Sequence, residues 1–331
     1  MIVDIRSEFP SQRVPNEHFE SLWEGWTAEK IYKKTGIKSR YVAQGDECAS
    51  DFAFKAAQSL LADRDLSRIG FLLFCTESPD YVLPPSSCIL QERLGLPMSC
   101  GAFDINLACS AYIYALATAH AYMQGGLAEE VLLLTGDTYT RYIHPDDKST
   151  RTIFGDAATA TLLSKNSSKR LDAFILCTDG RGAKGLILEK GGCRRPRMEA
   201  PASSLEDPSG EGHNPDYLYM NGPDIFNFTL RVVPDLVHDV AAKAGHALDE
   251  IDHFVFHQAN VFMLEHLRKK LKISEEKFVY AMEAVGNTVS STIPIALESC
   301  MKEGRFKPGD KILLAGFGVG LSWGGCMLYW N

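Results

Sequence analysis

Short apolar runs typical of β-strands alternate with stretches of helical periodicity along most of this 331-residue chain. The strand-like runs lie at 69–75, 103–106, 131–134, 253–257, 278–282 and 311–315. The helical stretches lie at 50–62, 110–123, 224–244, 261–271 and 292–302. Strands that alternate with helices predict an α/β protein whose parallel or mixed sheet is covered by helices on both faces.

The second half of the chain repeats the pattern of the first. Residues 103–137 and 280–317 both read as strand, sharp turn, helix, loop and a strand that ends in glycine, and a further strand precedes each unit. We interpret this as a duplication, although two unrelated strand–helix–strand segments would look similar by chance. It predicts two halves, 1–164 and 224–331. Between them, the Gly-, Pro- and charge-rich segment 165–223 is predicted to be a loop-rich insertion that caps a site or crosses a subunit interface.

The composition narrows the class of protein. With 45% hydrophobic and 23% charged residues, the chain is an ordinary globular protein, and its net charge of −8 argues against nucleic acid or an anionic membrane as a partner. We find no signal peptide and no apolar run of membrane-spanning length, which predicts a cytoplasmic protein. The nine cysteines are scattered without a CxxC pair, so we expect neither a disulfide framework nor a metal site.

Cys109 is the candidate nucleophile. It stands where the strand at 101–106 turns into the helix at 110–123, so its thiol should lie at a helix N-terminus, where free N–H groups stabilise a thiolate. Its neighbours Ala108 and Ser110 are small enough to let a substrate approach. The alternative is that Cys109 is a small buried residue, as most of the cysteines should be.

His257 and Asn287 are the polar residues that could assist Cys109. His257 follows an apolar strand and begins the sequence HQAN, which places it at the sheet edge where sites collect in α/β proteins. Asn287 follows Gly286 and occupies the position in the second unit that Cys109 occupies in the first. The simpler interpretations are that His257 is a structural histidine and that Asn287 is a turn residue. Together they predict covalent Cys/His/Asn chemistry.

Two further motifs contain residues that could serve the site. The sequence GFGVGLSWG at 316–324 is too close to the end of the chain for a dinucleotide-binding fold, but a glycine turn beside the nucleophile offers an N–H group for an oxyanion. Lys269 and Lys270 lie in LRKKLK, which is either a solvated helix face or a docking point for an acidic carrier protein.

With these segments assembled, the chain resembles the thiolase superfamily, and within it the β-ketoacyl-acyl-carrier-protein synthase III family. The motifs that carry the resemblance, in this order, are TGIKSRY, LPPSSCILQERLG, ACSAYIYAL, FGDAATATLL, MNGPDIF, HQAN, GNTVSSTIPIAL and GFGVGLSWG. The resemblance implies a five-layer αβαβα fold built from two duplicated halves, a homodimer, and a role in fatty acid biosynthesis.

The resemblance also implies roles for individual residues. It places a catalytic triad on Cys109, His257 and Asn287 and an oxyanion hole on the backbone N–H groups of Cys109 and Val319. Positions that line the pantetheine tunnel in the family match Phe154, Gly222, Phe226, Ala259 and Asn260. In place of two residues common in the family, a tryptophan that stacks on coenzyme A and an arginine that docks the carrier, this chain has Lys30 and Phe262. Carrier docking is therefore expected to use Lys269, Lys270 and Arg40.

The expected reaction is transfer of an acyl group from a coenzyme A or carrier thioester to Cys109, followed by decarboxylative condensation with a malonyl thioester. These thioesters are substrates, and no permanently bound cofactor is expected. One alternative is an acyltransferase or condensing enzyme of specialised metabolism or polysaccharide-precursor assembly that uses the same cysteine. A second alternative is a non-catalytic partner subunit of a heterodimeric synthase.

Overall fold

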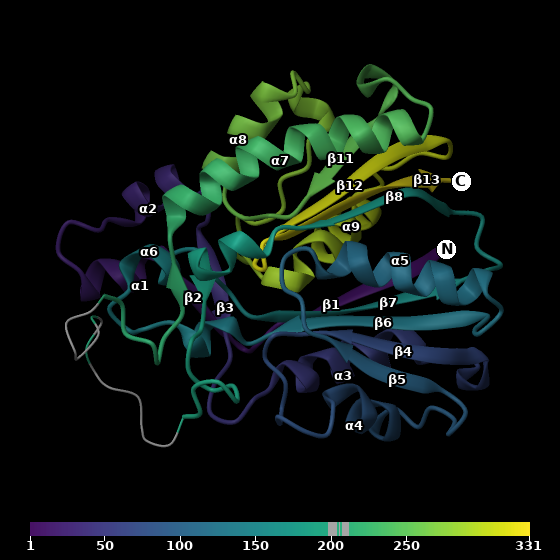
Figure 1. Cartoon of the computed structure of the whole chain (residues 1–331), viewed down its shortest axis with the longest axis horizontal. Helices are drawn as coiled ribbons and strands as arrows, with labels where there is room; N and C mark the ends of the chain where they lie inside the picture. The colour runs from purple at the N-terminus through teal and green to yellow at the C-terminus, as the bar shows by residue number, and fades with distance from the viewer. Residues whose placement is uncertain (198–203, 205, 207–211) are drawn as a thin grey trace.

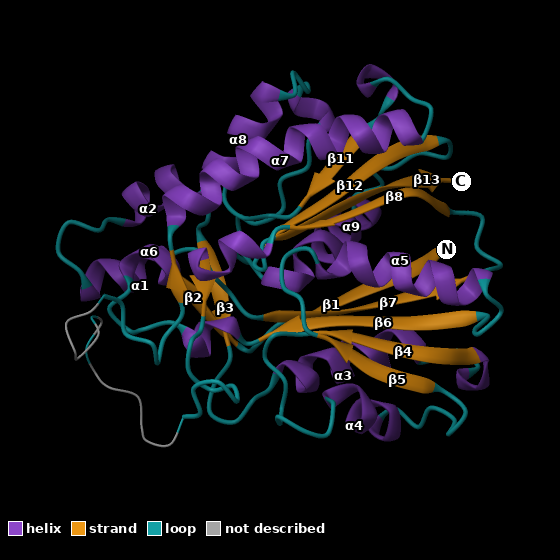
Figure 2. Cartoon of the chain, viewed as in Figure 1, coloured by secondary structure: helices purple, strands orange, loops and turns teal. Residues whose placement is uncertain are grey.

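The computed structural model describes residues 1–331 except 198–203, 205 and 207–211. Two β-sheets form its framework (Figure 2). The N-terminal sheet has the strand order β1-β7-β6-β4-β5, with β1 at Ile2–Glu8, β4 at Ile69–Cys75, β5 at Gly101–Ile105, β6 at Glu130–Asp137 and β7 at Ala157–Ser164. The C-terminal sheet has the order β11-β12-β13-β8, with β8 at Arg170–Thr178, β11 at His253–Phe256, β12 at Asp310–Gly318 and β13 at Ser322–Trp330.

Helices separate and cover the two sheets (Figure 1). The helices α5 (Ala111–Gln124) and α9 (Thr292–Lys302) lie between the sheets and contact strands of both. The helices α3 (Ala49–Leu61) and α4 (Ser86–Arg93) cover the outer face of the N-terminal sheet, whereas α7 (Gly222–Lys243) and α8 (Val261–Lys270) lie outside the C-terminal sheet. These layers confirm the predicted five-layer αβαβα architecture.

The buried position of α5 explains its composition. Its residues Ala111, Ile113, Ala115, Leu116 and Ala119 are fully buried. A helix that packs between two sheets needs apolar or small side chains around most of its circumference, and alanine allows both sheets to approach closely. The sequence of this helix therefore has no strongly polar face, unlike that of the outer helix α3.

The remaining helices and strands are short, with at most eight residues each. They are β2 (Gln12–Pro15), α1 (Asn16–Leu22), α2 (Ala28–Thr35), β3 (Ser39–Val42), α6 (Lys148–Arg151), β9 (Leu186–Ile187) and β10 (Tyr219–Met220). Within the described part of the chain, none of the helices combines the length and apolar character of a membrane span.

The strand predicted at 278–282 does not form. Phe278 makes only an isolated parallel bridge to Phe254, and no regular strand follows it. The side chain of Gln258 takes the place of a ladder partner, since its amide donates to the Val279 carbonyl oxygen at 3.2 Å and accepts from the Ala281 N–H at 2.7 Å. Residues 278–282 are apolar enough for a strand, but the Gln258 side chain binds backbone groups that a neighbouring strand would otherwise pair with.

The segment 165–223, predicted to be loop-rich, contributes a strand to the C-terminal sheet. Its residues Arg170–Thr178 form β8, which pairs antiparallel with β13. The C-terminal sheet therefore begins before residue 224. Part of the stretch 191–216, on which the loop prediction rested, lies outside the described residues. Sequence reasoning also missed β1, β7, β13 and α4.

Candidate active site

Cys109 lies in the turn between β5 and α5, as predicted, and its side chain is 7% exposed. The strand β12 passes directly against this turn. A Cβ atom on Gly318 would lie 2.7 Å from the Cys109 Cβ atom, which is closer than real contacts allow, and 3.0 Å from Sγ. Glycine at position 318 is therefore required for the close approach of the two elements.

The structure brings Cys109, His257 and Asn287 to one cavity of about 720 Å³. His257 follows β11 directly, and Asn287 lies in the loop that leads to α9. The backbone of Asn287 is held by the turn before β7, because its N–H donates to the Ile153 carbonyl and its own carbonyl accepts from the Gly155 N–H. The predicted tunnel residues also line this cavity, namely Phe154, Gly222, Phe226, Ala259 and Asn260.

The thiol of Cys109 lies next to the two backbone N–H groups predicted for an oxyanion hole. The backbone N–H groups of Cys109 and Val319 both lie within hydrogen-bonding reach of its sulfur. Val319 does not have a positive φ, so a side chain at this position causes no backbone strain. Both N–H groups therefore lie close to where the carbonyl oxygen of an acyl group on the Cys109 sulfur would be.

The net effect of the surroundings on Cys109 differs from the sequence-based expectation of a stabilised thiolate. Burial raises the pKa of Cys109 well above its ordinary value, and the nearby charges of Glu77 and Asp137 raise it further. The two N–H groups oppose this rise without reversing it. The resting residue is thus a thiol, because loss of hydration outweighs the field of the helix N-terminus.

Sequence reasoning missed the acidic residues beside Cys109. Glu77 lies just after β4, and Asp137 is the last residue of the neighbouring strand β6. The Glu77 N–H donates to Asp137 Oδ1 at 2.8 Å. The Tyr139 hydroxyl donates to Glu77 Oε2 at 3.2 Å. Burial raises the pKa of Glu77 to about 7 and that of Asp137 to about 8. The sequence feature that could have identified both residues is their position at the ends of predicted parallel strands, where sites collect in α/β proteins.

These values predict the pH dependence of acylation. Glu77 ionises as the pH rises through about 7, and its negative charge then opposes formation of the Cys109 thiolate. We expect Glu77→Gln to accelerate acylation at pH 8 by about three- to tenfold, a change of one unit or less in the pKa of Cys109, with little effect at pH 6. The measurement is the acylation rate by time-resolved intact-protein mass spectrometry. Glu92→Gln, on the exposed face of α4, is the control, and identical pH profiles for both variants would refute the prediction.

His257 is neutral in this environment. Its side chain is 2% exposed, and burial lowers its pKa to about 3. Its Nδ1 atom lies 2.7 Å from Thr292 Oγ1, and the Phe317 ring packs edge-on against the imidazole. The ring is therefore an uncharged donor or acceptor at physiological pH, with one nitrogen fixed by Thr292.

The side chain of Asn287 is also oriented by its own loop. Its Oδ1 atom accepts a hydrogen bond from the Val289 N–H at 3.0 Å. This leaves the side-chain NH₂ group as the donor that can serve a ligand in the cavity. Cys109, His257 and Asn287 thus offer a nucleophile and two neutral polar groups, an arrangement suited to acyl transfer and to stabilisation of a developing oxyanion.

Comparisons with known proteins place this arrangement in a family. The family model for the 3-oxoacyl-(acyl-carrier-protein) synthase III matches residues 103–180, and the model for its C-terminal part matches residues 241–330. The β-ketoacyl-(acyl-carrier-protein) synthase III of Neisseria gonorrhoeae is 32% identical over 97% of this chain and 96% of its own length. This chain belongs to the synthase III family.

Solved structures of synthase III proteins agree with this assignment. A crystal structure of a 3-oxoacyl-(acyl-carrier-protein) synthase III is 46% identical, with a TM-score of 0.95 over 99% of both chains. The 3-oxoacyl-(acyl-carrier-protein) synthase of Burkholderia xenovorans LB400 is 37% identical, with a TM-score of 0.90 over 100% of this chain and 93% of its own. These similarities confirm the thiolase-type fold inferred from the sequence.

Arg40, which the sequence predicts to dock a carrier protein, is not placed to do so. Arg40 is 1% exposed, and its guanidinium donates to the Asn16 side chain and to the Thr152 carbonyl oxygen, each at 2.8 Å. A residue whose charge is enclosed by the protein cannot contact a partner, so the prediction for Arg40 is wrong. It instead ties β3 to α1 and to the loop before β7. Lys269 and Lys270 lie at the end of α8, where the Lys269 side chain is 70% exposed.

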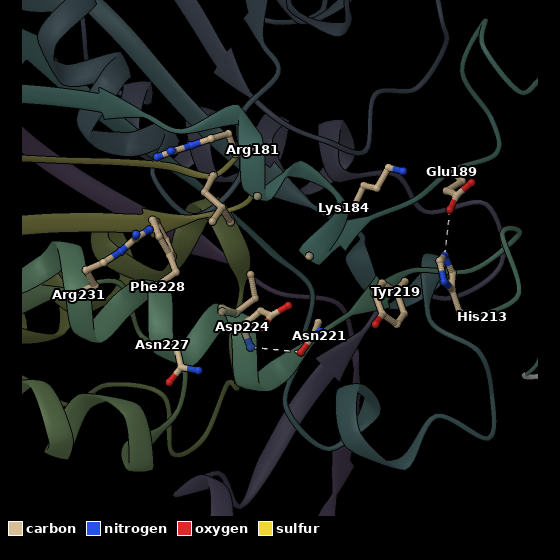
Figure 3. A pocket seen from close by; sticks show the side chains of 14 residues that line it. Arg181, Lys184, Glu189, His213, Tyr219, Asn221, Asp224, Asn227, Phe228 and Arg231 are labelled. Carbon is tan, nitrogen blue, oxygen red and sulfur yellow. Dashed lines mark hydrogen bonds and ion pairs between the residues drawn. The ribbon is translucent and has the colours of Figure 1, made fainter.

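A second, more polar groove of about 690 Å³ adjoins the cavity of this synthase III through Ile225 and Asn227 (Figure 3). Arg181 and Arg231 lie at one end of it, and an ion pair between Glu189 and His213 lies at the other. Arg181 is already paired with Asp179.

No cluster of His, Cys, Asp or Glu that could hold a metal ion occurs among the described residues.

Proposed function

We propose that this synthase III transfers an acyl group from a thioester to Cys109 and then condenses it with a malonyl thioester to give a 3-oxoacyl thioester. One observation carries the assignment of roles. Cys109, His257 and Asn287 line a single cavity, and two backbone N–H groups adjoin the thiol. The geometry thus supplies a nucleophile, an oxyanion site and two separate side chains for a second oxyanion.

In the first stage the Cys109 sulfur attacks the thioester carbonyl. The new carbon–sulfur bond forms as the bond to pantetheine breaks, and the proton of Cys109 leaves with pantetheine as its thiol. The oxyanion formed in between is held by the N–H groups of Cys109 and Val319. Since the resting thiol is protonated, the proton must leave during the attack rather than before it.

In the second stage the malonyl thioester loses CO₂, and the two electrons of the broken bond form an enolate. His257 Nε2 and the Asn287 NH₂ group donate to its oxygen. The enolate carbon attacks the acyl carbonyl on Cys109, a carbon–carbon bond forms, and the Cys109 sulfur leaves and takes up one proton. Retention of both His257 and Asn287 favours this carbanion chemistry over simple acyl transfer to another acceptor, and over a non-catalytic partner subunit.

We propose that the enzyme is a homodimer. The loop before α4 exposes three consecutive apolar residues, Tyr81, Val82 and Leu83, with 62%, 85% and 78% of each exposed. An exposed apolar loop of this kind is typical of an interface. The cytoplasmic location and the division into halves at 1–164 and 224–331 remain predictions from the sequence.

Incubation with acyl thioesters tests the function. The wild-type protein is treated with a panel of acyl-coenzyme A and acyl-carrier thioesters, from acetyl to long-chain and aromatic, and intact mass spectrometry detects the adduct. Malonyl-carrier is then added and the 3-oxoacyl product is measured. We expect a single acyl adduct that is discharged by the malonyl thioester. A stable adduct that malonyl-carrier never discharges would refute the condensing function, whereas absence of any adduct would favour the partner-subunit alternative.

Carrier docking by Lys269 and Lys270 can be separated from acyl chemistry. Because a carrier protein is acidic, we expect the double charge reversal Lys269→Glu, Lys270→Glu to raise the KM for a carrier-linked substrate by about tenfold, ~1.4 kcal/mol. The KM for the same acyl group on coenzyme A should not change. Lys55→Glu, on the exposed face of α3, is the control. An equal change for both donors would show that these lysines do not dock the carrier.

A further inference from the structure

Thr292 is the residue that contacts the imidazole of His257. It is the first residue of α9 and is 2% exposed. Its hydroxyl oxygen lies 2.7 Å from His257 Nδ1 and 3.1 Å from the carbonyl oxygen of Val289. In the described part of the chain, no other hydrogen bond to the His257 ring is found.

The single hydroxyl proton of Thr292 links these two contacts to the tautomer of His257. If the hydroxyl donates to Val289, its oxygen must accept from Nδ1–H, and Nε2 then carries only a lone pair. If the hydroxyl donates to Nδ1, the proton of the neutral ring resides on Nε2, which becomes a donor. Since burial keeps the imidazole neutral, these two states are the alternatives at working pH.

We propose that Thr292 is a positioning residue that donates its hydroxyl proton to His257 Nδ1 and so directs an Nε2–H group into the cavity. This inference rests on the proposed function, because an enolate oxygen needs a donor and would be repelled by a lone pair. In this state the Thr292 hydroxyl gives up its hydrogen bond to the Val289 carbonyl oxygen, 3.1 Å away, for the closer imidazole nitrogen, 2.7 Å away. His257 lines the cavity, and Nδ1 is the ring atom turned away toward α9.

The same turn orients the second donor. Val289 has a φ of 55°, a left-handed backbone conformation that is strained for a β-branched residue. In this conformation its N–H binds Asn287 Oδ1 at 3.0 Å, while its carbonyl oxygen lies beside the Thr292 hydroxyl. Val289 therefore orients Asn287 directly, and its carbonyl oxygen is the acceptor that competes with His257 for the Thr292 proton.

Two substitutions at Thr292 test the inference. Thr292→Val keeps the shape and removes the hydroxyl, whereas Thr292→Ser keeps the hydroxyl. We expect the valine variant to lower kcat for malonyl-thioester decarboxylation by about tenfold, the size expected when one buried hydrogen bond that orients a donor is lost. KM and the rate of Cys109 acylation should stay within about twofold. The serine variant should recover most of the lost kcat.

A matched control is present in the same turn. Thr288 is 1% exposed and its hydroxyl has no hydrogen-bond partner among the described residues. Thr288→Val therefore removes a buried hydroxyl without touching His257, and decarboxylation should be unchanged. Thermal unfolding of all three variants checks that the fold is intact.

A ¹⁵N NMR spectrum of the full-length protein, labelled with ¹⁵N at histidine, shows directly which ring nitrogen of His257 carries the proton. His257→Gln assigns the signals of His257 by their disappearance. We expect a protonated Nε2 and an unprotonated Nδ1 in the wild type. A proton on Nδ1, or unchanged decarboxylation in a folded Thr292→Val, would overturn the inference. Failure of the wild type to decarboxylate any malonyl thioester would instead contradict the proposed function, and the NMR result would still decide the tautomer.

Discussion

Replacement of Cys109 by alanine is expected to abolish acylation of the protein and to lower formation of the 3-oxoacyl product on the order of a thousandfold or more. The physical reason is that the covalent intermediate cannot form without the thiol that adjoins the two backbone N–H groups. Decarboxylation of the malonyl thioester should persist, because the enolate is stabilised by His257 and Asn287 rather than by the thiol. The measurement is intact mass spectrometry together with release of CO₂.

The control for this variant is another cysteine. Cys88 is exposed and lies on α4, so Cys88→Ala removes an accessible thiol without changing the cavity. It should acylate and condense like the wild type. A stoichiometric acyl adduct that survives in Cys109→Ala would show that the nucleophile has been misassigned.

Replacement of His257 or Asn287 by alanine is expected to lower decarboxylation and condensation on the order of a hundredfold or more, since each removes one preorganised donor to the enolate oxygen. Acylation of Cys109 should fall by less than about tenfold, because its oxyanion is held by backbone N–H groups. The double variant should lose less than the product of the two single losses, because both donors serve one oxygen.

Separate assays of the two stages are needed to test this prediction. Acylation is followed by intact mass and decarboxylation by CO₂ release, each in the same preparation. His238→Ala, an exposed histidine on α7, controls for loss of an imidazole elsewhere. If His257→Ala abolished acylation and decarboxylation alike in a protein that still melts cooperatively, the proposed division of roles would be wrong.

Two of the main site residues were predictable because each follows a locally encoded strand. Cys109 follows the strand β5, and His257 follows β11. Local sequence placed each residue at the carboxyl end of its own strand, where sites collect in α/β proteins. Because β5 and β11 belong to different sheets, the packing of the two sheets brings these ends together. Gly318 belongs to a motif visible in the sequence, and its close contact with Cys109 explains why that motif is rich in glycine.

Other features depended on contacts between segments that are distant in the sequence. The strand expected at 278–282 was replaced by side-chain hydrogen bonds from Gln258. A charged residue such as Arg40 in a short β-strand is expected to be exposed. In the structure, however, Arg40 is enclosed by α1 and by the loop before β7. Burial is a property of the assembled layers, and local hydrophobic patterns do not report it for a single charged residue.

The sequence by itself determined the alternation of strands and helices, the family, and the positions of Cys109, His257 and Asn287, because these follow from local periodicity and from motifs of fixed order. Only the tertiary structure decided the chemical state of these residues. Burial makes Cys109 a thiol and His257 a neutral ring, Glu77 adds an opposing charge, and Thr292 fixes one imidazole nitrogen. Protonation depends on solvation and on charges brought together by packing, and neither exists before the layers assemble.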